Sequence, residues 1–165
     1  MPTIANLRTG LLIALLAAVA LRAQAADDHA ALQGMKDGKI VYDVTEGDGK
    51  ALLERIEVID ETRQALIKQG VTPHFVLTFR GPATRMVQTD MEKVKPEDRP
   101  YAAKIAAALA QMSKSPGVES LEQCGVAVRH AGTRAEDVVA PVKVIGNSFV
   151  SLMAYQSKGY AYIRP

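Results

Sequence analysis

Cys124 is the residue of this chain best suited to covalent chemistry, and it is the only cysteine among 165 residues. It stands in the segment Leu121-Glu122-Gln123-Cys124-Gly125. A chain with one cysteine cannot form an internal disulfide, so this thiol is unpaired, shared with a second chain, or used in a reaction. The surroundings of Cys124 therefore decide what chemistry the sequence offers.

A thiol is a useful nucleophile when its surroundings favour the thiolate. The ordinary pKa of a cysteine is about 8.5, and a helix N-terminus or a nearby cation lowers it. Cys124 follows a predicted strand over 118–123, and residues 125–131 are predicted to begin a helical turn that carries Arg129 and His130. Two interpretations remain open: Cys124 is a nucleophile at the start of a helix, or it is a small buried apolar residue, as free cysteines often are.

The other residue types that carry chemistry form no recognisable motif. The three histidines, His29, His74 and His130, lie far apart in the sequence and show no ligand spacing, so no metal site is predicted. The sequence contains neither a phosphate-binding loop nor a dinucleotide-binding glycine motif. We therefore expect a protein without a cofactor.

Residues 1–25 have the pattern of an export signal. Arg8 supplies the positive start, Leu11–Leu21 is an almost unbroken aliphatic run, and Ala23-Gln24-Ala25 has the small residues that a signal peptidase accepts. The run of about 11 residues is shorter than the roughly 20 that span a bilayer as a helix. We predict a cleaved signal peptide and a periplasmic mature protein. An uncleaved anchor is the alternative, because Arg22 lies between the apolar run and the cleavage point.

Cleavage changes the charge of the protein. Residues 1–25 contain two of the 20 basic residues and none of the 18 acidic residues, so the net charge falls from +2 to zero. A neutral chain has no basic excess for a phosphate backbone or an anionic membrane surface, so nucleic-acid and membrane binding are not expected. The remaining length suits one domain with a single core, which we place at residues 39–165 after a flexible arm over 26–38.

Hydrophobic periodicity in the mature chain predicts strands that alternate with helices. The predicted strands are 39–44, 74–79, 118–123, 142–145 and 160–163, and the predicted helices are 50–69, 83–88, 100–114 and 149–158. The charged segment 89–99 is predicted to be a solvated loop. Alternating strands and helices favour a parallel sheet with helices on both faces, so we predict a three-layer α/β/α fold with a mainly parallel five-stranded sheet.

A parallel sheet of this kind collects its strand-to-helix loops at one edge, where ligands of α/β proteins usually bind. This topology brings Cys124 near the loops that follow the second and fourth predicted strands. The residues predicted to assist it there, as binding groups for a substrate or a negative charge, are Arg80, Gly81, Gly125, Asn147 and Ser148.

Residues 38–165 resemble the DsrE/DsrF-like family of small sulfur-relay proteins, in an exported branch. The matching segments are Lys39–Val44, Val76–Pro82, Leu121–Gly125 with Ala131-Gly132 after it, and above all the run from Val142 to Ser148 followed by Gln156–Pro165. The resemblance implies a compact α/β/α subunit that assembles into homo-oligomers. It also implies that Cys124 occupies the position of a cysteine that accepts sulfur as a persulfide in some members.

The residues and the resemblance together leave two functions open. The first is a sulfurtransferase or sulfur carrier that holds sulfane sulfur as a persulfide on Cys124 and exchanges it with a thiol-bearing donor or acceptor protein. The second is a non-catalytic binding or assembly subunit of the same fold, in which Cys124 is buried packing. The segment from Thr89 to Pro100 is longer and more charged than a minimal subunit needs, so it could cover the thiol or alter assembly.

Overall fold

The structure, a computed structural model, describes residues 27–165. The signal peptide predicted for residues 1–25 lies outside the described residues. Within the predicted arm, His29–Leu32 forms a one-turn helix, α2, with no buried side chain. Among the described residues, no helix combines the length and the hydropathy that crossing a bilayer requires.

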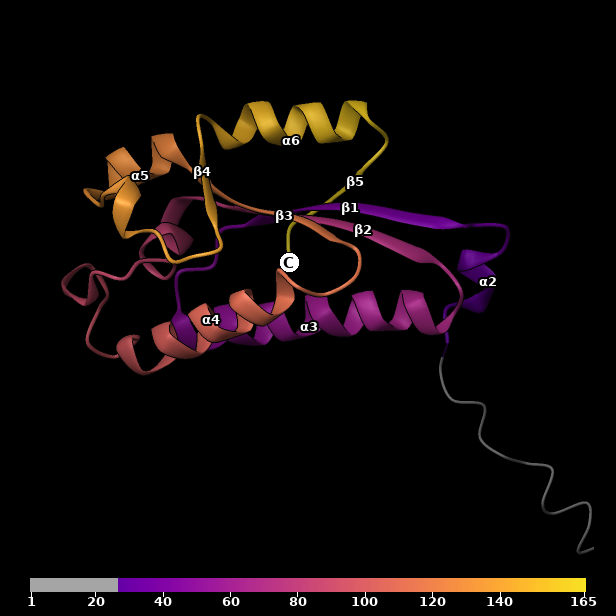
Figure 1. Ribbon diagram of the computed structural model, residues 1–165, viewed down its shortest axis with the longest axis horizontal. Coiled ribbons are helices and arrows are strands. Elements are labelled where there is room, and N and C mark those ends of the chain that lie inside the picture. Colours follow the sequence, from indigo (N-terminus) through magenta and orange to yellow (C-terminus); the bar gives the residue numbers. More distant parts are fainter. Residues whose placement is uncertain (1–26) are drawn as a thin grey trace, which may run out of the picture. The chain divides into compact units, whose positions relative to one another are not determined.

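Five parallel strands form one sheet (Figure 1). They are β1 (Asp37–Val44), β2 (Thr72–Phe79), β3 (Val118–Cys124), β4 (Lys143–Ile145) and β5 (Ala161–Ile163). Their order across the sheet is β4-β3-β2-β1-β5. The predicted α/β class and the five-stranded parallel sheet are therefore confirmed, and the strand order adds what the sequence could not supply.

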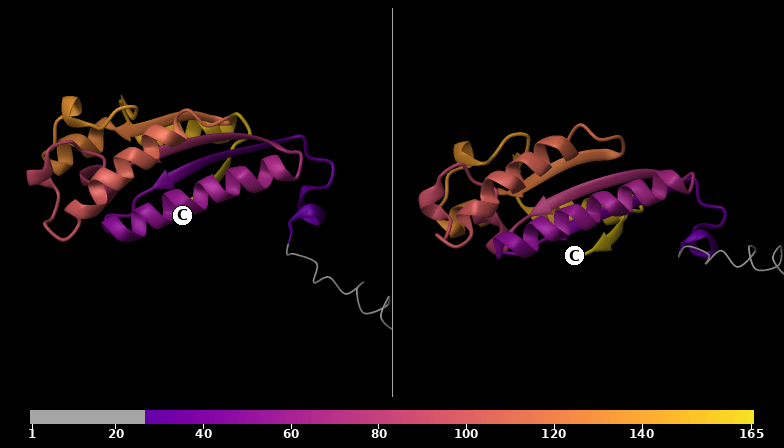
Figure 2. Two further views of the ribbon diagram at one scale, coloured as in Figure 1. Left: turned by 60° about the horizontal axis from the view of Figure 1, so that its bottom comes forward. Right: turned by 90° about the horizontal axis from the view of Figure 1, so that it is seen from below.

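Helices cover both faces of this sheet, as Figures 1 and 2 show. Helices α3 (Gly49–Lys68) and α4 (Arg99–Met112) lie side by side on one face, and α6 (Ser148–Ser157) lies on the other. A short helix, α5 (Gly125–Ala131), follows β3 directly at the carboxyl ends of the strands. These layers give the predicted three-layer α/β/α arrangement.

The long helix α3 forms because its sequence supplies both a cap and an apolar face. The Asp48 carboxylate accepts the Ala51 amide at 2.8 Å, which satisfies one of the unpaired donors of the first turn. Leu52, Ile56 and Ile59 recur at helical spacing and are fully buried against the sheet. The predicted helix over 50–69 is thus confirmed to within one residue at each end.

The main hydrophobic core lies between the sheet and the pair α3 and α4. Alternate residues of the central strands point into it, because successive side chains of a strand face opposite sides. The strand residues of this core are Tyr42, Val44, Phe75, Leu77, Phe79 and Leu121, and helix residues such as Ile105 and Leu109 pack against them.

The opposite face of the sheet, under α6, is more polar. Its apolar cluster consists of Val41, Val76 and Leu152, with Tyr155 and Tyr160 at its margin. The intervening positions on the same strand faces are buried polar residues or the thiol, namely Asp43, Thr78, Glu122 and Cys124. The functional candidate therefore lies on the polar face.

Two local predictions need correction. The helix predicted at 83–88 is a 3-10 helix, η1 (Gly81–Arg85), because Pro82 starts the helical turn earlier and Gln88 instead forms a bridge with Val138. The segment 89–99 is not simply a solvated loop. Val94 is buried in the core on the α3–α4 side, and Asp98 accepts the Gly49 amide at 2.8 Å.

Candidate functional site

The strand register brings three loops together around Cys124. β2 pairs with β3 so that Phe79 is opposite Gln123, which leaves Arg80 beside Cys124 one step further along. On the other side, β4 pairs Ile145 with Cys124. The loops after β2, β3 and β4 therefore meet at one edge of the sheet, as the topology of a parallel sheet predicts.

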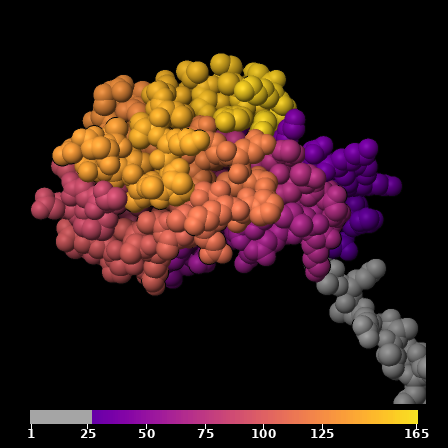
Figure 3. Space-filling view, viewed as in Figure 1, coloured from indigo at the N-terminus to yellow at the C-terminus, as the bar shows by residue number. Residues whose placement is uncertain are grey.

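Cys124 lies between the first turns of two helices. It is the residue that immediately precedes α5, and its sulfur accepts a hydrogen bond from the Ser148 amide, the first residue of α6, at 3.3 Å. The residue is only 4% exposed. Figure 3 shows α6, in yellow, forming the surface on this side of the molecule. Ser148 therefore contacts the thiol directly, whereas Val94, in the segment from Thr89 to Pro100, is buried on the opposite face of the sheet.

The surroundings of Cys124 favour its thiolate. Burial raises the pKa of the thiol, but the nearby Ser148 hydroxyl and the amides of Ser148, Ala127 and Val126 outweigh that effect and lower the pKa below its ordinary value. Of these groups, the Ser148 amide at the start of α6 donates a hydrogen bond to the sulfur. The Cys124 side chain makes no capping hydrogen bond to α5, and within the described residues the buried Ser148 hydroxyl has no hydrogen-bond partner. The sulfur thus accepts a hydrogen bond from one helix N-terminus and lies beside a second.

Gly125 has a packing role at this position. A Cβ atom added there would lie 2.8 Å from the Ile145 carbonyl oxygen and 3.4 Å from that of Gly146. The backbones of α5 and β4 approach each other too closely for any larger residue. Gly125 therefore permits the loop after β4 to lie close to Cys124. This loop leads into α6 and brings Ser148 to the sulfur.

Asn147 acts one residue before the contact with the thiol. Its side-chain oxygen accepts the Phe149 amide at 3.0 Å, so it caps α6. Of the five residues predicted to assist Cys124, Ser148 is the one with a direct hydrogen bond to its sulfur. Asn147 and Gly125 hold the backbone that carries this contact.

Arg80 is bound to a buried carboxylate at the same edge. Its guanidinium donates to both oxygens of Asp43, at 2.7 and 2.6 Å, and the Asp43 side chain is completely buried. The Tyr162 hydroxyl donates to the same carboxylate at 2.6 Å. The guanidinium also lies 4.9 Å from the ring centre of Phe149, the residue next to Ser148. The ion pair of Arg80 and Asp43 therefore connects the end of β2 with β1, with β5 through Tyr162, and with the start of α6 through Phe149.

Gly81 lines a shallow pocket of about 290 Å³ between η1 and α5. The pocket also contains Arg85, Ala127 and His130, so it presents two basic side chains and no acidic one. Gly81 has a φ of +56°, a conformation that glycine adopts without strain. Ala127 links the pocket to the site, because its amide is one of those that stabilise the thiolate.

A buried carboxylate near the thiol escaped the sequence analysis. Glu122 is 6% exposed and accepts hydrogen bonds from the Ser151 hydroxyl at 2.5 Å and from the Tyr155 hydroxyl at 3.1 Å. It lies two residues before Cys124 and therefore on the same face of β3. That spacing was the signal that could have revealed it, because a carboxylate on a strand face covered by a helix requires partners.

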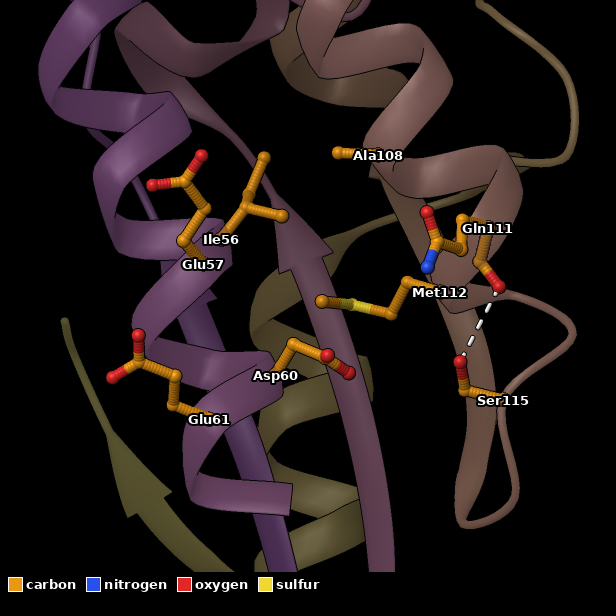
Figure 4. Close-up of a pocket in the computed structure, with 8 residues that line it drawn as sticks. All are labelled: Ile56, Glu57, Asp60, Glu61, Ala108, Gln111, Met112 and Ser115. Atoms are coloured by element: carbon orange, nitrogen blue, oxygen red, sulfur yellow. Dashed lines mark hydrogen bonds between the residues drawn. The ribbon is translucent and has the colours of Figure 1, made fainter. Parts of the chain in front are cut away.

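A second pocket, of about 360 Å³, lies on the far side of the sheet between α3 and α4 (Figure 4). The side chains of Ile56 and Met112 point into the gap between these helices, and Glu57 and Glu61 stand at its α3 side. Residues 27–165 contain no cluster of three or more histidine, cysteine or acidic side chains arranged to hold a metal ion.

Comparison with known proteins supports the fold and leaves the activity open. No family model matches the chain. An uncharacterised protein of Aquifex aeolicus (strain VF5) is 25% identical over 125 residues, which cover 76% of this chain and 55% of that protein. The chain thus spans about half the length of the curated relative that it matches.

A solved structure shares the architecture. MTH1491, a protein of unknown function from Methanobacterium thermoautotrophicum, superimposes with a TM-score of 0.60 and 19% identity, covering 78% of this chain and all of that one. This likeness concerns the fold alone. The α/β fold implied by the resemblance to DsrE-like proteins is therefore supported.

Proposed function

We propose that this protein is a periplasmic member of the DsrE/DsrF-like family that carries or transfers sulfane sulfur as a persulfide on Cys124. The observation that carries the proposal is the hydrogen bond at 3.3 Å from the Ser148 amide, at the N-terminus of α6, to the sulfur of the residue that immediately precedes α5. A thiol stabilised in this way forms the thiolate at a lower pH than an ordinary thiol does. The unpaired state of the single cysteine is consistent with that role.

The proposed reaction is an exchange between sulfur atoms. The Cys124 thiolate attacks the outer sulfur of a polysulfide or thiosulfate; the new bond joins Sγ to that sulfur, and the leaving sulfide chain or sulfite departs with the electron pair of the broken bond. A thiolate on an acceptor protein then attacks the outer sulfur of the persulfide. The electron pair returns to Sγ and regenerates the Cys124 thiolate, by the same logic as disulfide exchange.

The test is intact-mass measurement of the full chain after incubation with polysulfide and, separately, with thiosulfate. We expect a gain of one sulfur atom that reductant removes and that Cys124→Ser abolishes. Ser148→Ala keeps the amide and removes the hydroxyl, so it serves as a matched variant with slower loading and an intact fold. The proposal is wrong if the wild-type chain gains no sulfur from either donor.

The depth of the thiol favours a second candidate, a non-catalytic binding or assembly subunit. Cys124 is 4% exposed, so a donor reaches the sulfur only when neighbouring residues move. Thiol labelling of the folded chain separates the two functions. Labelling that is fast at neutral pH without denaturant favours the carrier, and labelling that follows global unfolding favours buried packing.

We further propose that the protein forms homo-oligomers. On the outer side of α6, Phe149, Val150 and Met153 expose more than half of their surface, and Tyr162 and Ile163 are exposed on edge strand β5. Clusters of exposed apolar side chains of this kind often mark contacts between proteins. Native mass spectrometry of material purified from the cell envelope tests the assembly, and N-terminal sequencing of the same material tests export and signal cleavage.

A further inference from the structure

Helix α6 runs along β3 and contacts it at two polar points. Ser148 meets Cys124 at one of them, and Ser151 and Tyr155 meet Glu122 at the other. The two strand residues are about 6.6 Å apart along the strand, and this distance lies between the rise of about 4.5 Å from Ser148 to Ser151 and that of about 10.5 Å from Ser148 to Tyr155. The sheet-facing side of α6 is therefore attached to β3 through both contacts.

The contact at Glu122 is a strong one. Its carboxylate is buried and receives two hydroxyl donors, and among the described residues it takes part in no ion pair. A buried carboxylate without a cation depends on its hydrogen bonds, because leaving it unpaired in the interior is costly. The same helix face also packs Leu152, with half-buried Tyr155 beside it, on Val41 and Val76 of β1 and β2. Over β3, the residues that accept hydrogen bonds from α6 are Glu122 and Cys124, so the contact at Glu122 is the one that can hold the helix beside the thiol.

We propose that Glu122 is a positioning residue for the thiol, which anchors α6 through the hydroxyls of Ser151 and Tyr155 and so holds Ser148 against the Cys124 sulfur. Glu122 does not touch the reacting atoms. It fixes the position of α6, and the position of α6 in turn affects the stability of the Cys124 thiolate. This inference concerns the site of the proposed sulfur chemistry but can be tested whether or not sulfur is transferred.

The other charged and titratable groups near this contact do not account for such an effect. Arg80, on the neighbouring strand, is paired with Asp43. Lys143 is opposite Glu122 on β4, but its side chain is exposed, and Arg129 on α5 donates to the Gly125 carbonyl. Tyr155 on α6 keeps its proton, because burial and then the charge of Glu122 raise its pKa to about 12. Its hydroxyl therefore remains a donor over the whole range in which the thiol titrates.

The sign of the effect separates positioning from simple charge. If Glu122 acted only as a nearby negative charge, Glu122→Gln would lower the pKa of Cys124, because it removes a repulsion. If Glu122 positions α6, the same substitution raises the pKa of Cys124, because the hydrogen bond from the Ser148 amide to the sulfur is weakened. Tyr155→Phe and Ser151→Ala leave the charge in place and remove one donor each, so they test position alone.

The experiment measures the thiolate absorbance of the full chain against pH, with Cys124→Ser subtracted as the blank. We expect the double variant Ser151→Ala/Tyr155→Phe to raise the pKa of Cys124 by about one unit, the loss of one hydrogen bond to a charged group. Glu122→Gln should raise it less, and Ser151→Thr, which retains the hydroxyl, should leave it near the wild-type value. Urea unfolding of each variant confirms that the fold persists under the conditions of the titration.

Two results would overturn the inference: a lower pKa in Glu122→Gln, or an unchanged pKa in the folded double variant. His74→Gln, at the opposite end of the sheet, is the matched control and should not move the pKa. Because this readout requires no sulfur donor, its failure is distinct from failure of the proposed function. If the chain gains sulfur but the pKa of Cys124 does not depend on Glu122, the proposed carrier function stands and the positioning role of Glu122 is wrong.

Discussion

The two faces of the sheet are built from the same strands and differ in kind. Toward α3 and α4, the strands present large apolar side chains such as Phe75, Leu77 and Phe79, all fully buried. Toward α6, the same strands present Asp43, Thr78, Glu122 and Cys124, also buried. Burial is therefore equally deep on both sides, and the difference lies in what is buried.

This contrast indicates that the two faces have different roles, one in stability and the other in the geometry of the site. Burial of apolar side chains stabilises the fold in proportion to the buried area and requires no specific partner. A buried polar group destabilises the fold unless it forms a hydrogen bond or an ion pair. A face that depends on pairing is held in one geometry, which is what a thiolate between two helix N-termini requires. The apolar face then supplies most of the stability on which that geometry depends.

The largest effect is expected from truncation of the apolar face. Phe79→Ala removes a fully buried ring and should lower the free energy of unfolding by about 3–5 kcal/mol, measured by urea denaturation. The matched variant is Phe149→Ala on α6, where the ring is 64% exposed and contacts Arg80, and its cost should stay within about 1 kcal/mol. Comparable losses from the two phenylalanines would contradict the conclusion that burial on the apolar face supplies most of the stability.

An effect of about 3 kcal/mol is expected on the polar face when Arg80 is replaced by alanine. Among the described residues, Arg80→Ala leaves the buried Asp43 carboxylate with the Tyr162 hydroxyl as its one remaining side-chain partner, and an uncompensated buried charge is strongly destabilising. Arg134→Ala is the control, because Arg134 pairs with Glu136 and Asp137 on an exposed surface, where ion pairs contribute about 1 kcal/mol or less. Equal costs for the two arginines would show that the pair with Asp43 is as well hydrated as a surface pair.

The sequence predicted the layers well because they follow from local patterns. The alternation of β-branched strands and amphipathic helices located nearly every element, and the end of β3 at Cys124 put the thiol at the correct edge. The order of the strands was not predictable, since β5 joins β1 across almost the whole length of the chain. Pairing over such a distance leaves no periodic signal in the sequence.

The sequence predicted the positions of the candidate residues better than their contacts. Arg80, Asn147 and Ser148 all lie at the expected edge, yet their hydrogen bonds depend on contacts distant in the sequence or on the direction of a side chain. The Arg80 guanidinium meets Asp43, 37 residues earlier, and the Tyr155 hydroxyl meets Glu122, 33 residues earlier. The Asn147-Ser148 pair before a helix was the local signal of a cap that could have been read.

The smallest expected effect is a dependence of stability on pH that arises from a histidine on the polar face. At the amino ends of the strands, the His74 ring contacts Glu119 at 2.7 Å and Asp37 at 3.1 Å, and hydrogen bonds to these two carboxylates raise its pKa. Burial opposes ionisation of Glu119, but hydrogen bonds from Tyr160 and His74 lower its pKa overall.

The contribution of protonated His74 is fully present below its unfolded pKa of about 6.5 and is lost as the pH rises through its raised folded value. That of Glu119 is present above its unfolded pKa of about 4.5 and is lost as the pH falls through its lowered folded value. The free energy of unfolding of the wild-type chain should therefore exceed that of His74→Gln by up to about 1 kcal/mol between about pH 5 and pH 6.5. The difference should be smaller near about pH 9. Urea unfolding across this range measures the difference, with the exposed His29→Gln as control. A difference that does not change with pH, or that grows toward alkaline pH, would show that His74 contributes by packing and not by charge.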